Sequence, residues 1–114
     1  MLLTLAILSF KRFLMNYNDI LKAMMSAHQK HSDEVAEMIN AQLGTELKKR
    51  KINAFTSSPD NRRYQRCPKD YLVAFAQALN LNGAISASDF QAITTFTDDG
   101  LFKYFQEKHP NNGT

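Results

Sequence analysis

The stretch SDEVAEMINAQLGTELKKRKINAFTS, residues 32–57, contains two apolar segments separated by a glycine. In the first segment, Val35, Ile39 and Leu43 recur at the spacing of one buried helix face. Gly44 follows directly, and glycine readily adopts the left-handed conformation that ends many helices. The stretch therefore predicts two consecutive helices with a break at Gly44.

Both helices have recognisable start signals. Ser32 is a favoured N-cap residue, and Asp33 and Glu34 follow it where the helix dipole stabilises anions. We expect Thr45 to cap the next helix in the same way, with that helix covering about residues 46–57. Two short helices joined by a tight turn that contains glycine are the ingredients of a helix-turn-helix.

The second of these helices separates its side chains by type. Its apolar residues fall within one broad arc of a helical wheel: Leu47, Ile52, Ala54 and Phe55. Lys49, Arg50 and Asn53 fall on the opposite side. Lys48 and Lys51 border or enter the apolar arc, so their ammonium groups would have to reach outward to solvent.

The remainder of the chain predicts further helices and no strand, because no segment alternates between apolar and polar residues. A turn is expected at residues 58–61. The fold class is therefore predicted to be all-α, a compact bundle of five to six short helices that contains the helix-turn-helix-like pair. Four other helices are expected. The first covers residues 18–30 and is capped by Asn18 or Asp19, and the second has Pro68 at its first position and stops at 80–83. The third begins at Ser86 or Ser88, and the fourth runs from near Thr97–Asp98 to His109–Pro110.

Positive charge is concentrated in one part of the chain. Residues 43–68 hold seven of the 14 Lys and Arg but only two of the 11 Asp and Glu, although the whole chain has a net charge of only +3. Such a local excess indicates an anionic partner, of which nucleic acid is the commonest. The interpretation that follows is a DNA-binding helix-turn-helix protein, a transcriptional regulator of bacterial or phage type.

In that geometry the second helix enters the major groove of double-stranded DNA. The expected base contacts are Lys49, Arg50 and Asn53. The expected phosphate contacts are Thr45, Lys48, Ser57, Arg62, Arg63 and Arg66. A homodimer through the Phe-rich residues 84–108 is expected, because one such helix buries little surface. The alternative is a non-catalytic adaptor whose basic end binds an acidic protein surface.

Other kinds of site lack their usual signals. No glycine-rich phosphate loop and no nucleophile–base spacing are recognisable, so we expect neither an enzyme nor a cofactor. His28 and His31 lie close together but have no convergent ligands nearby, so no metal site is expected. Cys67 is the one cysteine and can form no internal disulfide, which favours a reducing compartment, the cytoplasm.

Residues 1–14, MLLTLAILSFKRFL, are strongly apolar but too short to span a bilayer. They could be an interfacial anchor, an extra helix packed on the domain, or an upstream extension of a chain that naturally starts at Met15. We favour the third, because Met15 opens directly onto a helix-start pattern. The expected domain is then 15–110, followed by a flexible tail at 111–114.

Two parts of this chain resemble a known bacterial family. Residues 15–24, MNYNDILKAM, and 54–79, AFTSSPDNRRYQRCPKDYLVAFAQAL, are similar to one repeat unit of the YehS-like family of unknown function. The positions that carry the resemblance are Asn18, Asp19, Ile20, Leu21, Tyr64, Cys67, Leu72 and Phe75. The layout of residues 35–56 followed by a basic loop also resembles small phage-encoded helix-turn-helix regulators, which implies DNA binding.

Overall fold

The computed structural model describes residues 15–108 of the chain. Within this range the secondary structure is entirely helical, which confirms the predicted all-α class. The expected extension at 1–14, the expected helix end at His109–Pro110 and the expected tail at 111–114 lie outside the described residues. The helices are α2 (Tyr17–Ala27), α3 (Ser32–Leu43), α4 (Lys49–Thr56), α5 (Lys69–Leu81), α6 (Ala87–Thr95) and α7 (Asp98–Lys108).

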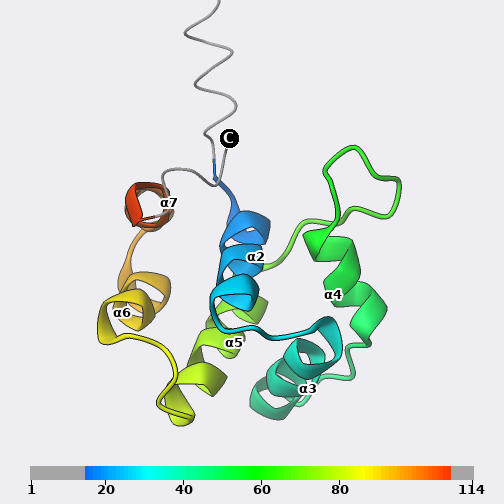
Figure 1. Ribbon diagram of the computed structural model, residues 1–114, viewed down its shortest axis with the longest axis horizontal. Coiled ribbons are helices and arrows are strands. Elements are labelled where there is room, and N and C mark those ends of the chain that lie inside the picture. Colours follow the sequence, from blue (N-terminus) through cyan, green and yellow to red (C-terminus); the bar gives the residue numbers. More distant parts are fainter. Residues whose placement is uncertain (1–14, 109–114) are drawn as a thin grey trace, which may run out of the picture.

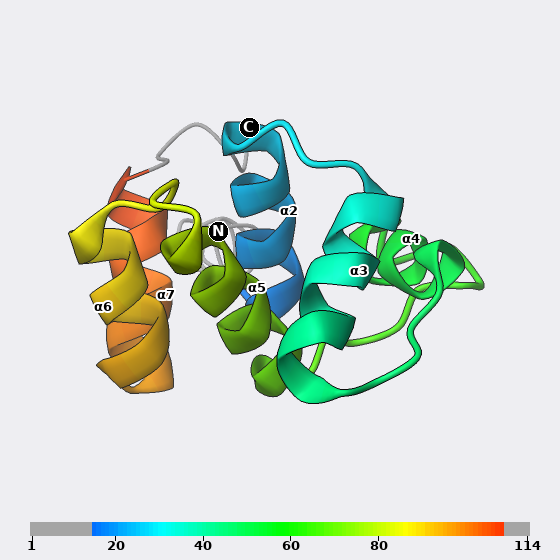
Figure 2. The ribbon, with the colours of Figure 1, turned by 90° about the horizontal axis from the view of Figure 1, so that it is seen from below.

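The described helices surround a core that α2 and α5 share. α3 and α4 lie on one side of this central pair, and α6 and α7 lie on the other (Figures 1 and 2). α5 packs against α2, α3 and α6, and it contributes Leu72, Phe75 and Leu79, which are all fully buried. α4 packs mainly on α2 and α3, and its Phe55 ring also contacts the Tyr71 ring of α5. The loop that follows α4 lies along its remaining side.

The start of α2 differs from the expected one. Its N-cap is Asn16, whose side chain accepts a hydrogen bond from the Asp19 amide at 2.9 Å, while the Asp19 carboxylate accepts one from the Asn16 amide at 3.1 Å. This reciprocal capping box starts the helix at Tyr17, so Asn18 is an internal residue and is buried. The helix ends at Ala27, short of the expected residue 30, because the chain turns through Gln29 with a φ of 52°.

The break between α3 and α4 occurs at Gly44 as predicted, with a left-handed φ of 68°. The expected caps on either side are wrong. His31 is the N-cap of α3 and Ser32 is its first residue, because the Glu34 carboxylate accepts a hydrogen bond from the His31 amide. Thr45 does not cap α4, which begins four residues later at Lys49.

Asn40 explains the late start of α4. Its carboxamide oxygen accepts hydrogen bonds from the Thr45 hydroxyl at 2.7 Å and from the Leu47 amide at 2.8 Å. Its amide group donates to the Leu47 carbonyl oxygen at 2.9 Å. These hydrogen bonds hold residues 44–48 in a non-helical connection, which is longer than the tight turn that the sequence suggested.

The other helix starts are close to the predicted ones. Pro68 is the N-cap of α5 and not its first residue, and the Ser86 side chain caps α6 by accepting from the Asp89 amide. α7 starts at Asp98, as expected. Asp89 on α6 also accepts hydrogen bonds from Tyr104 and Lys108 of α7, which ties these two helices together.

Candidate functional site

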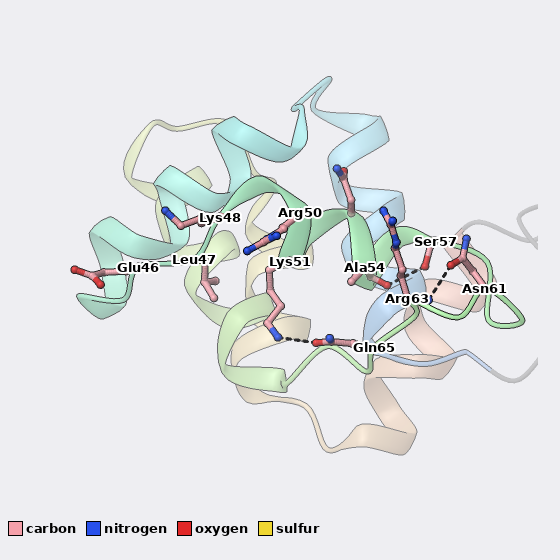
Figure 3. A pocket seen from close by; sticks show the side chains of 11 residues that line it. Glu46, Leu47, Lys48, Arg50, Lys51, Ala54, Ser57, Asn61, Arg63 and Gln65 are labelled. Atoms are coloured by element: carbon pink, nitrogen blue, oxygen red, sulfur yellow. Dashed lines mark hydrogen bonds between the residues drawn. The ribbon is translucent and has the colours of Figure 1, made fainter.

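A groove of about 870 Å³ runs between α4 and the loop that follows it (Figure 3). Four of the side chains that line it are cationic, from Lys48, Arg50, Lys51 and Arg63, and Glu46 is the one acid among them. The complete lining is Glu46, Leu47, Lys48, Arg50, Lys51, Asn53, Ala54, Ser57, Asn61, Arg63 and Gln65. The groove is therefore a basic site built by one short helix and its adjoining loop.

The loop is anchored to the core by Asn18 of α2. The Asn18 amide donates to the carbonyl oxygens of Phe55 at 2.8 Å and Gln65 at 2.7 Å. Its oxygen accepts from the Cys67 amide at 2.9 Å. Phe55 lies in the last turn of α4, where carbonyl groups lack partners within the helix. One buried side chain thus fixes both ends of the loop.

The loop then returns along α4. The Gln65 amide donates to the Ala54 carbonyl oxygen at 3.2 Å, and the Lys51 ammonium donates to the Gln65 side chain at 2.6 Å (Figure 3). Ala54, which lies at one edge of the apolar arc of α4, is only 8% exposed. The loop therefore covers part of the helix surface, and the position of Lys51 within the apolar arc reflects this contact.

The expected turn at residues 58–61 is present. The Asn61 amide donates to the Ser58 carbonyl oxygen at 2.9 Å, and the Ser58 hydroxyl donates to Asp60. The hydrogen bond from Ser58 has the largest effect in lowering the pKa of Asp60, and a backbone hydrogen bond has a smaller effect in the same direction. The Asp60 carboxylate is therefore charged at neutral pH. Arg62 and Arg63 are exposed just beyond the turn, and both line a second hollow with Asp60 and Asn61.

The three residues expected to contact bases are all exposed, but they differ in their surroundings. Arg50 and Asn53 line the groove, whereas Lys49 does not. The Asn53 carboxamide oxygen accepts a hydrogen bond from the Ser32 hydroxyl at the start of α3. Asn53 is therefore linked to the neighbouring helix.

The six residues expected to contact phosphate are only partly brought together. Lys48, Ser57 and Arg63 line the groove. Thr45 is held by Asn40, while Arg62 and Arg66 are exposed elsewhere on the loop. The prediction also missed residues that do line the groove, notably Lys51 and Gln65. Lys51 was visible as a cation inside the apolar arc, but nothing local indicated that Gln65 folds back onto it.

The two acids of this surface, Glu46 and Asp60, only partly balance its positive charge. Among residues 15–108, none of the seven cations of residues 43–68 lies in an ion pair, whereas Lys30, Lys69 and Lys108 each pair with a carboxylate. α4 also has no acidic residue in its first turn and no side-chain cap. Its helix dipole therefore adds to the positive potential of the adjacent lysines instead of offsetting it.

Cys67 lies behind this loop and is only 3% exposed. Burial raises the pKa of its thiol to about 12, so the thiolate required for reaction is scarce at neutral pH. We expect Cys67 to react with a thiol reagent such as Ellman's reagent at least about tenfold more slowly in the native protein than in urea. Rapid reaction of the native protein, followed by absorbance, would show that the loop opens readily.

Two other features are absent from the part of the chain that the structure describes: a metal-binding cluster and a membrane-spanning helix. Between residues 15 and 108, no three His, Cys, Asp or Glu side chains are grouped so that they could hold a metal ion. No helix in that range has the length and apolar character needed to cross a membrane. No family model, curated protein or solved structure matches the chain.

Proposed function

We propose that this chain is a DNA-binding protein that uses α4 and the following loop as its contact surface. The observation that carries the proposal is the groove, where Lys48, Arg50, Lys51 and Arg63 converge without ion-pair partners among the described residues. Unpaired cations that lie close together on a folded surface repel one another. Binding of a polyanion is therefore favourable, because it neutralises these cations and releases the counterions of the polyanion. Regulation of transcription is the role that we propose for this binding.

The helical arrangement supports the same proposal. α3 and α4 form the helix-turn-helix-like pair, α2 packs against α4, and Arg50 lies near the start of the second helix of the pair. Lys49, Arg50 and Asn53 of α4, which the sequence predicted as base contacts, and Arg62, Arg63 and Arg66 of the loop are the residues that we propose to lie against the duplex. A homodimer through residues 84–108, where Phe96 is 37% exposed, would present two such surfaces to one duplex.

Removal of two groove cations tests the proposal. We expect Lys48→Ala/Arg63→Ala to bind a mixed-sequence duplex more weakly and to reduce the slope of log K against log salt by about 1.8, since each phosphate contact contributes about 0.9. Fluorescence anisotropy over a series of salt concentrations measures both quantities. The control is Lys22→Ala/Lys103→Ala, which removes the same charge from exposed positions on α2 and α7.

The control variant separates the effect of the groove cations on DNA affinity from the effect of the protein's net charge. Equal losses in both double variants would mean that DNA senses only the total charge of the protein. No binding of the unaltered protein at low salt would contradict the proposal altogether, and the adaptor function, in which the groove binds an acidic protein, would then be favoured.

A further inference from the structure

We infer that the groove seats a single phosphodiester strand of a DNA duplex and grips it without reading its base sequence. This inference rests on the proposed function and specifies the substrate as duplex DNA of any sequence. It departs from a helix-turn-helix reading in one respect: α4 would lie against the backbone of the duplex, and would not insert its outer face among the base edges.

The distribution of charge across the groove fits a linear polyanion. Lys48, Arg50 and Lys51 belong to the α4 side, and Arg63 belongs to the loop side (Figure 3). The small side chains of Ala54 and Ser57 also line the groove. Small residues leave room for a chain to approach the surface closely, while cations on both sides can neutralise consecutive phosphates.

The width of this part of the molecule opposes insertion into the major groove. A single helix is about 10–12 Å across with its side chains, and the major groove of B-DNA is about 12 Å wide. Here α4 is joined laterally to the returning loop through Gln65, which bonds to both Ala54 and Lys51. α4, the groove and the loop together are wider than one helix, so this surface fits the outside of the duplex better than its major groove.

Asn53 is poorly placed to read adenine. Bidentate recognition of adenine requires the carboxamide oxygen to accept from the base while the amide group donates to it. The Asn53 oxygen accepts from the Ser32 hydroxyl, and this hydrogen bond holds the carboxamide towards the start of α3. The remaining exposed groups on the outer face of α4 are those of Lys49 and Arg50, which bind phosphate as readily as guanine.

The groove also lacks the groups that bind single strands. Its lining contains no aromatic residue. The nearby Tyr64 is half-buried, and its hydroxyl accepts a hydrogen bond from the side-chain nitrogen of Asn16 at 3.4 Å. Proteins that bind single-stranded DNA without sequence preference stack its bases on aromatic side chains. A duplex, whose phosphates are more closely spaced along the axis, is therefore the better ligand.

Direct binding measurements with the full chain test the inference. The probes are fluorescent duplexes of equal length with mixed, A·T-only and G·C-only sequences, a deoxythymidine single strand, and poly-glutamate as an acidic polypeptide. We expect the three duplexes to bind within about twofold of one another, since a sequence reader loses about tenfold at one mismatched base pair. The single strand and poly-glutamate should bind more weakly at equal charge concentration.

Charge placed inside the groove provides the structural test. Ser57→Glu should weaken duplex binding by about tenfold or more, because it adds an anion where the strand would lie. Arg63→Glu, at an exposed loop position, should do the same and is independent of any effect of Ser57 on the end of α4. Asn80→Glu, which adds the same charge at an exposed position of α5 away from the groove, is the matched control and should change affinity by less than about twofold.

The outcomes separate this inference from the proposed function. Duplex binding that persists in Ser57→Glu and Arg63→Glu, or a base preference that Asn53→Ala alters, would overturn the backbone grip while leaving DNA binding intact. Tighter binding of the single strand would overturn the choice of duplex. Poly-glutamate that competes as well as DNA, or a complete lack of duplex binding, would overturn the proposed function as well.

Discussion

Replacement of Asn18 with Ala should lower the free energy of unfolding by about 3 kcal/mol, because three backbone groups lose their hydrogen bonds in a closed site. The groups are the carbonyl oxygens of Phe55 and Gln65 and the amide of Cys67. Asn18 is only 5% exposed, so water cannot replace these bonds without opening the loop. Urea denaturation followed by circular dichroism measures the change.

Two further variants show whether hydrogen bonding is the cause. Asn80→Ala, an exposed position on α5, should change stability by less than about 0.5 kcal/mol. Asn18→Asp keeps the size and the acceptor oxygen, but it replaces the donating amide group with a second oxygen that faces two carbonyl oxygens. It should therefore lower the free energy of unfolding at least as much as Asn18→Ala does at neutral pH. A loss below about 1 kcal/mol in Asn18→Ala would mean that other contacts hold the loop.

Truncation of the central aromatic side chain should have an even larger effect. Phe75 is fully buried on α5, the helix that packs against α2, α3 and α6. We expect Phe75→Ala to lower the free energy of unfolding by about 4 kcal/mol, through lost burial and the cavity that remains. Chemical denaturation measures this, with circular dichroism of the native baseline to verify that the variant is still helical.

Phe96 provides the matched control for this truncation. It follows α6, is 37% exposed, and contacts the ring of Tyr104 edge to face. Phe96→Ala should therefore lower the free energy of unfolding by about 1 kcal/mol or less. Similar losses for the two variants would contradict the placement of Phe75 at the centre of the fold.

Helices were the part of this fold that the sequence could predict, because their signals are local. The spacing of Val35 and Ile39 marks the buried face of α3, but Leu43, which was expected on the same face, is 42% exposed. Gly44 ends the helix with the expected left-handed backbone. Cap positions were less predictable. Thr45 has the right chemistry for a cap, but Asn40 binds its hydroxyl and delays α4 to Lys49.

The candidate site was predicted only in its charge. The density of Lys and Arg in residues 43–68 is visible in the sequence, and the structure gathers four of these cations around one groove. The path of the loop depends on Asn18, which is separated from Gln65 and Cys67 by more than forty residues of sequence. A residue with the chemistry of a helix cap gave no local sign that it would instead hold a distant loop.

The bare N-terminus of α4 has a consequence for how this protein can change. Lys48, Lys49, Arg50 and Lys51 crowd the positive end of an eight-residue helix that has no acidic residue in its first turn. An acidic substitution there would strengthen the helix by about 0.3–1 kcal/mol and would weaken attraction for a polyanion at the same time. Selection for thermal stability alone would thus replace these cationic residues with acidic ones first. If the cations persist under such selection, they serve a function other than folding.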